Sequence, residues 1–171
     1  MRDLNDANSI EAFMKSGMRL LILGGGYIGL EAAATARKFG VDVTLVEIEE
    51  RILKRVAAKE TSDYIRSLHI SNGVKIKEAI GLDKLEIVGE KVVNASLTDD
   101  TDINVDFVIV GIGITPNTDL AEGANLKINN GILINEKCQT SVSNIYAAGD
   151  CTSFKYKNTL VRLESVGNAI D

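Results

Sequence analysis

The sequence lacks the features that mark several large classes of protein. Its 171 residues include no Trp, one Pro and one His, and 24 acidic residues outnumber 19 basic ones, for a formal net charge of −5. An acidic chain with no basic run argues against electrostatic binding to nucleic acid or to an anionic membrane. The longest apolar stretch, from Leu20 to Leu30, is interrupted by glycines and falls short of the roughly 18 residues that a membrane span needs.

Side chains that could form a hydrolytic or metal centre are also scarce. Cys138 and Cys151 have neither metal-ligand spacing nor the CxxC spacing of a redox pair, which is consistent with a reducing, cytoplasmic environment. The single His69 is expected at a helix end, with no partner that would make it a catalyst. No nucleophile with its base can be assembled, so any chemistry is expected to come from a bound cofactor.

Hydrophobic periodicity predicts an α/β fold in the first part of the chain. A short helix is expected over 6–15, a buried strand over 19–23, a helix over 27–39 and a β-branched strand over 41–46. Strand, glycine turn, helix and strand within this length form one βαβ unit of a parallel, Rossmann-like sheet. Helical spacing returns over 57–68.

The period changes after that helix. Short strands are expected over 74–77, 85–88, 92–97 and 105–110, and the close hairpins between them predict an antiparallel meander inserted before the sheet resumes. Pro116 suggests a boundary between a domain over 1–115 and a truncated segment over 116–171. Strands are expected in that segment over 132–134 and 145–148. A helical pattern that stops within two turns at the C-terminus suggests a fragment of a longer protein.

A glycine-rich turn follows the first buried strand and has the spacing G-x-G-x-x-G. Gly24 would permit the tight turn, Gly26 would let the backbone approach a pyrophosphate, and Gly29 would let the next helix pack closely on the strand. The motif alone is weak, since a glycine turn can simply end a strand. Glu47 strengthens it, because an acidic residue 18 positions later, at the end of the second strand, can bind the hydroxyls of an adenosine ribose.

Three charged side chains lie near this motif, and two of them have alternative interpretations. Glu47 would repel a 2′-phosphate and favour NADH over NADPH, or it is a solvated acid beside other glutamates. Arg51 would reach the adenosine side, where it could tolerate a 2′-phosphate, or it balances those glutamates. Glu31, expected in the first turn of the helix, would complement the helix dipole.

The motifs taken together resemble a known family, the FAD-dependent NADH:ferredoxin and rubredoxin reductases of the putidaredoxin reductase type. The resemblance extends over nearly the whole chain in unbroken order, and the final segment is its most specific part. The matching stretches are RLLILGGGYIGLEAAATA (19–36), 43–47, VIVGIGITPN (108–117), NGILIN (130–135), TSVSNIYAAGDC (140–151) and VRLESVGNAID (161–171).

The resemblance implies a cofactor for each part of the chain. Residues 1–115 would bind NADH, and 116–171 would be part of an FAD domain whose remainder lies outside this chain. The implied NADH contacts are Gly26, Tyr27, Ile28 and Gly29 at the pyrophosphate, Glu47 at the ribose, Ile112 and Gly113 on the far side, and Glu31 near the nicotinamide. The implied FAD contacts are Asp150 at the ribityl chain, the Val166 backbone at the flavin ring and Glu164 at the contact between the two rings.

The implied reaction passes hydride from NADH to FAD and single electrons to a ferredoxin or rubredoxin, with the isolated fragment inactive. A related NADH oxidase, nitrite reductase or disulfide reductase remains an alternative, as does a non-enzymatic NADH-responsive module. Thr115 stands where the family commonly has Arg before Pro116, which affects the expected NADH orientation. Truncation leads us to expect self-association, or disorder after about residue 116.

Overall fold

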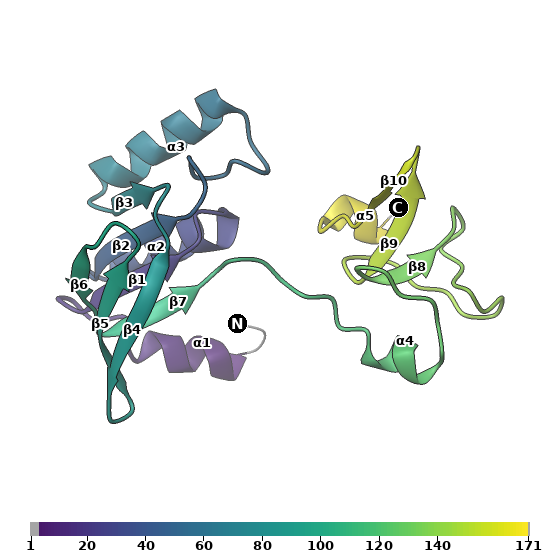
Figure 1. Ribbon diagram of the computed structural model, residues 1–171, viewed down its shortest axis with the longest axis horizontal. Coiled ribbons are helices and arrows are strands. Elements are labelled where there is room, and N and C mark those ends of the chain that lie inside the picture. Colours follow the sequence, from purple (N-terminus) through teal and green to yellow (C-terminus); the bar gives the residue numbers. More distant parts are fainter. Residues whose placement is uncertain (1–3, 171) are drawn as a thin grey trace. The chain divides into compact units, whose positions relative to one another are not determined.

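The computed structural model describes residues 4–170. They form two units, one ending at Ile112 and the other beginning at Gly113 (Figure 1). Among the described residues, no helix has the length and apolar character that crossing a membrane requires.

The first unit is built on a parallel sheet with strand order β3-β2-β1-β7. Helix α2 connects β1 to β2, and helix α3 connects β2 to β3, so the predicted α/β fold and its first βαβ unit are confirmed. The bounds are β1 Arg19–Leu23, α2 Tyr27–Lys38, β2 Asp42–Glu47, α3 Lys59–Ser71, β3 Lys75–Glu78 and β7 Phe107–Val110.

An antiparallel meander is inserted before the parallel sheet resumes at β7, as predicted, but its strands are not those expected. It consists of β4 Leu82–Val88, β5 Lys91–Leu97 and β6 Asp102–Asn104. The strand expected at 74–77 is instead β3, which pairs with β2 in the parallel sheet. The strand expected at 105–110 begins later, as β7 at Phe107, because Asp106 turns the chain and its carboxylate accepts hydrogen bonds from the backbone and guanidinium of Arg19 at 2.7–3.0 Å.

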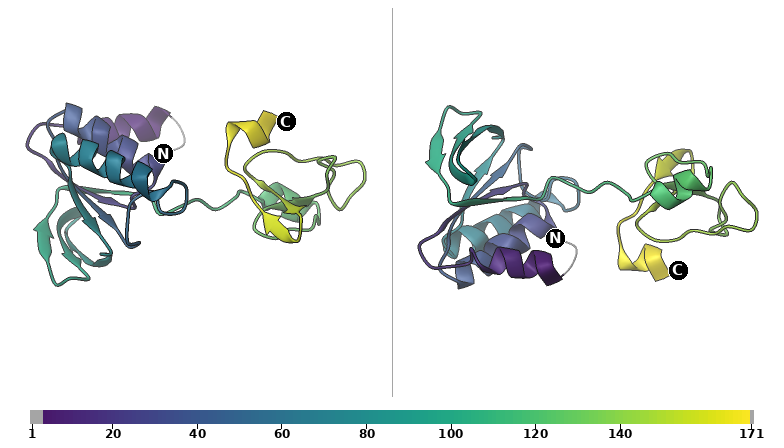
Figure 2. Two further views of the ribbon diagram at one scale, coloured as in Figure 1. Left: turned by 90° about the horizontal axis from the view of Figure 1, so that it is seen from above. Right: turned by 90° about the horizontal axis from the view of Figure 1, so that it is seen from below.

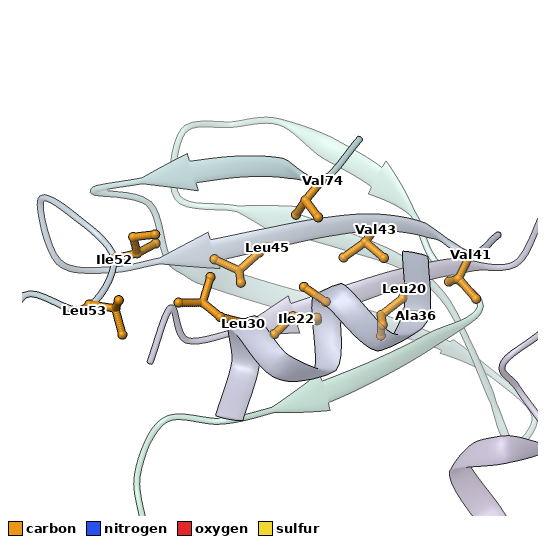
Figure 3. Packing of buried hydrophobic residues seen from close by; sticks show 11 residues of the cluster. Leu20, Ile22, Leu30, Ala36, Val41, Val43, Leu45, Ile52, Leu53 and Val74 are labelled. Atoms are coloured by element: carbon orange, nitrogen blue, oxygen red, sulfur yellow. The ribbon is translucent and has the colours of Figure 1, made fainter. Parts of the chain in front are cut away.

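The sheet is covered on both faces. Helices α2 and α3 lie on one side of the sheet and the meander lies on the other (Figure 2). Alternate residues of β1 therefore enter different apolar clusters, with Leu20 and Ile22 on the helix side and Leu21 on the meander side. The helix-side cluster (Figure 3) also contains Leu30, Ala33, Ala36, Val41, Val43, Leu45, Ile52, Leu53 and Val74. A strand buried on both faces explains the continuous apolar run in the sequence.

The first helix ends earlier than predicted. Helix α1 covers Leu4–Glu11 and contains no buried residue. The chain beyond it turns back to the sheet, where Phe13 stacks on Phe107 of β7 with ring centroids 5.5 Å apart. Met14 and Met18 pack against the helix-side cluster. The residues that follow α1 thus contact β7 and the helix-side cluster.

The second unit contains a small mixed sheet in which β9 is central, parallel to β8 and antiparallel to β10. Its elements are α4 Asp119–Gly123, β8 Ile132–Ile134, β9 Thr152–Tyr156, β10 Thr159–Val161 and α5 Val166–Ile170.

One predicted strand of this unit is wrong. Residues 145–148 form no strand, because turn and loop hydrogen bonds occupy their amides: Ile145 N–H donates to Val142 O and Ala147 N–H to Cys138 O, both at 3.0 Å. Only Tyr146 makes an isolated antiparallel bridge, to Gln139. The apolar run is therefore tied to its own neighbours, and β9 takes the central place in the sheet.

Candidate nucleotide-binding site

The glycine turn lies at the carboxyl end of β1, where two of its glycines are required by the packing of the fold. Gly24 has φ +103°, and a Cβ there would overlap the carbonyl of Gly111. A Cβ at Gly29 would overlap the carbonyl of Gly24 and lie 3.2 Å from Cγ2 of Ile22. These positions hold the turn, α2 and the end of β7 close together, in the roles that the motif predicts.

Gly26 is different, because the fold itself does not require a glycine there. Its φ of −80° is available to any residue, and a Cβ added to it would have no atom within 4 Å. The space beside its backbone is open, at the head of a helix. An open cradle at this position fits a diphosphate approaching the main chain.

The first amides of α2 face this space without an intrahelical partner. The first helical hydrogen bond runs from Leu30 N–H to Gly26 O at 3.1 Å, so the N–H groups of Tyr27, Ile28 and Gly29 precede the hydrogen-bonded ladder. No side chain caps Gly26. The side chains of Tyr27 and Ile28 are exposed. Unpaired amides and the positive end of the helix dipole together favour an anion at this point.

Glu47 connects the end of β2 to the glycine turn. Its Oε2 accepts a hydrogen bond from Gly25 N–H at 2.6 Å, and its Oε1 accepts one from Glu49 N–H at 2.8 Å. The side chain is half-buried. Each carboxylate oxygen has a second lone pair, so Glu47 can accept hydrogen bonds from ribose hydroxyls while it holds the turn.

Arg51 forms no ion pair with the neighbouring glutamates among the described residues. Its guanidinium donates to Ser62 Oγ, to Ala57 O at 3.0 Å and to Lys54 O at 3.3 Å. The neighbouring glutamates are balanced by Lys54 instead, at 2.8 Å from Glu49 and 3.7 Å from Glu50. Arg51 therefore organises the segment between β2 and α3, and its contact with a nucleotide stays a prediction.

The remaining predicted contacts of this unit lie at its surface. Glu31 is exposed, and its predicted place in the first turn of α2 is wrong: the helix begins at Tyr27, so Glu31 falls in the second turn. Ile112 is exposed after β7, and Gly113, the first residue of the second unit, has φ +125°. Their contacts with a nucleotide stay predictions.

Sequence reasoning missed Gly111. Its N–H donates to Leu23 O at 2.7 Å, and a Cβ there would lie 3.6 Å from Gly29 N. The signal was present in the sequence as a second Gly-x-Gly directly after a strand.

In the second unit, two of the predicted flavin contacts, Asp150 and Glu164, bond to a residue that the sequence did not single out. Arg162 Nη1 pairs with Glu164 Oε1 at 2.7 Å and donates to Asp150 O at 3.3 Å. Its side chain is 11% exposed, and its buried Nε has no hydrogen-bond partner among the described residues. Val166 begins α5 with an exposed side chain. The contacts of Asp150, Glu164 and Val166 with FAD stay predictions.

The parallel sheet, the glycine turn and the open head of α2 define a dinucleotide-binding α/β domain. A family profile described as pyridine nucleotide-disulphide oxidoreductase matches residues 1–171, and the chain belongs to this family. This match and the relatives described next confirm the resemblance inferred from the motifs.

Similar proteins are known in sequence and in structure. Putidaredoxin reductase CamA of Pseudomonas putida is 42% identical over 175 residues, which cover 100% of this chain and 42% of that protein. Rhodocoxin reductase of Rhodococcus erythropolis is 38% identical over 173 residues, covering 100% and 40%. The matching chain in the crystal structure of the covalent putidaredoxin reductase–putidaredoxin complex has a TM-score of 0.91 at 42% identity, covering 98% of this chain and 41% of that one. The chain thus spans about two fifths of the length of these relatives.

Proposed function

We propose that this chain is the NAD(H)-binding part of a flavoprotein reductase, which passes hydride from NADH to FAD and electrons on to a ferredoxin or rubredoxin. The single observation that carries the nucleotide part is the open space at Gly26. The other glycines of the motif are explained by packing, whereas this one is explained by a ligand that approaches the backbone.

The two predicted parts of the chain bind different cofactors. Residues 1–115 bind NADH, and residues 116–171 contribute Asp150, Glu164 and Val166 to the FAD site. The turn, the head of α2 and Glu47 all lie in the first unit, so this chain alone is expected to bind NADH. It is expected to be inactive alone, since flavin binding requires more of the protein than these residues.

NADH and FAD supply the hydride and electron chemistry, and the residues of this chain bind and orient these cofactors. The amides of Tyr27, Ile28 and Gly29 hold the diphosphate, while Glu47 selects the sugar. A carboxylate beside the ribose would be repelled by a 2′-phosphate, which favours NADH over NADPH. We also propose a cytoplasmic location, which is consistent with the two free cysteines.

Titration of the chain with NADH, followed by nucleotide fluorescence, tests the proposal. Gly26→Ala is expected to abolish saturable binding, because the methyl group takes the space needed by the diphosphate, while thermal stability stays close to that of the wild type. Glu47→Arg is expected to reverse the preference toward NADPH.

Gly123→Ala is the matched control, since a Cβ at this glycine of α4 also meets no atom within 4 Å. It should leave the affinity for NADH unchanged. Saturable NADH binding by Gly26→Ala with wild-type affinity would refute the assignment of the site.

A further inference from the structure

A short segment between β2 and α3, Ile52 with Leu53, contacts the glycine turn. Leu53 N–H donates to Gly25 O at 2.9 Å, and Ile52 Cγ2 lies 2.6 Å from the point where a Cβ of Gly25 would be. Gly25 N–H is bonded to Glu47. Both polar groups of the Gly25 backbone are therefore fixed, one by Glu47 and one by this segment.

The segment is itself held by side chains from two other elements. Ile52 N–H donates to Glu78 Oε1 of β3 at 2.8 Å, and Ile52 O accepts a hydrogen bond from Ser62 Oγ of α3 at 2.8 Å. Ser62 and Ile52 are fully buried. Arg66 Nε donates to both carboxylate oxygens of Glu78, at 2.9 and 3.0 Å. Glu78 thus has a fixed orientation as well as a bond to the segment.

The backbone of this segment is strained. Leu53 has φ +54°, in the left-handed region that a bulky side chain seldom occupies, and its side chain is buried. In Figure 3, Ile52 and Leu53 lie at the same end of the apolar cluster as Leu30, the residue whose amide starts the α2 ladder. Such a conformation persists only where the surroundings determine it, and it is commonly found at binding sites.

We propose that Glu78 is a positioning residue for the nucleotide site, acting through Ile52 and Leu53 on Gly25 and so on Glu47. The proposal rests on the function proposed above for the glycine turn. Without the bond from Ile52 N–H, the segment loses an anchor. Gly25 and the carboxylate bonded to it would then no longer be held for the diphosphate and the sugar.

The test combines NADH titration with the ¹⁵N–¹H amide resonance of Gly25, both on the full chain and well below its melting temperature. Glu78→Ala is expected to raise the Kd for NADH about tenfold, the size of one lost hydrogen bond to a charged group. It should also move the Gly25 resonance, because the bond to Glu47 Oε2 changes. Glu78→Gln keeps an acceptor for Ile52 N–H and is expected to restore most of the affinity.

Asp99→Asn is the matched control. Asp99 pairs at 2.9 Å with Lys77, the neighbour of Glu78 on β3, and the side chains of Asp99 and Lys77 are both half-buried. It should change neither the Kd nor the Gly25 resonance. If Glu78→Ala does not fold, Glu78→Asp is used instead, because the shorter side chain withdraws the carboxylate from Ile52 N–H.

The outcomes separate the two proposals. Wild-type Kd and an unmoved Gly25 resonance in the folded variant would overturn the role of Glu78 and leave the NADH site standing. Failure of the wild-type chain to bind NADH would refute the site itself. In that case, an unmoved Gly25 resonance in Glu78→Ala would also overturn the link between Glu78 and the turn.

Discussion

The two units differ in what they bury. All the buried apolar side chains among the described residues belong to the first unit except Ala121 of α4. The interior of the second unit has Thr152 and Ser153 instead, whose hydroxyls donate to Gly149 O and Asn129 O, both at 2.7 Å. Burial of large aliphatic groups is the main source of folding free energy. The first unit therefore has the means to fold by itself, while the second relies on hydrogen bonds and small residues.

Hydrogen exchange is expected to show the largest difference. Amides of β1 and β2 should open only with global unfolding, at about 5 kcal/mol or more, while those of β8 and β9 should exchange at a small fraction of that free energy. Mass spectrometry of exchanged peptides measures both. Equal protection in the two sheets would mean that the two units do not differ in stability. It would also contradict the predicted disorder after residue 116.

Core truncation should have the next largest effect. Leu45→Ala in β2 removes a fully buried side chain and is expected to lower the free energy of unfolding by about 3 kcal/mol. Leu120→Ala in α4 removes a side chain that is 94% exposed and should change it by less than about 0.5 kcal/mol. Urea denaturation followed by circular dichroism gives both values, and a Leu120 effect as large as that of Leu45 would be the contrary result.

Two glycines of the G-x-G-x-x-G motif, Gly26 and Gly29, sharpen the comparison within the first unit. Gly29→Ala places a methyl group against the Gly24 carbonyl and is expected to cost about 2 kcal/mol. Gly26→Ala has open space and should cost a few tenths, about the level of a surface substitution. Thermal melts of the two variants measure the difference. Equal destabilisation would mean that Gly26 is required by the fold after all.

The smallest expected effect is electrostatic. A hydrogen bond from Lys77 lowers the pKa of the Asp99 carboxyl from 3.8 to about 2. Because the folded state favours the ionised form, the contribution to stability is complete above pH 4 and is lost as the pH falls toward 2. Melting temperatures between pH 6 and 2 should fall less steeply in Asp99→Asn than in the wild type. Parallel curves would show that the pair does not contribute.

The fold was predictable where local pattern and burial agree. Two apolar strands flanking a glycine turn and a small-faced helix identified β1, α2 and β2. The pattern failed for β3, whose sequence Lys-Ile-Lys-Glu has few apolar residues because it lies at the sheet edge, so nothing local distinguishes parallel from antiparallel pairing. It failed again for 145–148, where apolar residues form loop hydrogen bonds.

The candidate site was also predictable only in part. Spacing placed Gly24, Gly26, Gly29 and Glu47 at one edge of the sheet. It did not indicate the bond between Glu47 and Gly25, nor the anchoring of Ile52 by Glu78 and Ser62. Those contacts join side chains from three elements, and their partners lie 10 to 26 positions apart in the chain.

The hydrogen-bonded pair of Arg19 and Asp106 also indicates where the chain should tolerate an inserted peptide or domain. It anchors the return from the meander at the start of β1, outside the β4–β5 hairpin, which ends at Leu97. Gly89 and Glu90 at that tip are exposed, in the layer opposite the helices. A peptide epitope or a reporter domain grafted there should leave nucleotide recognition intact.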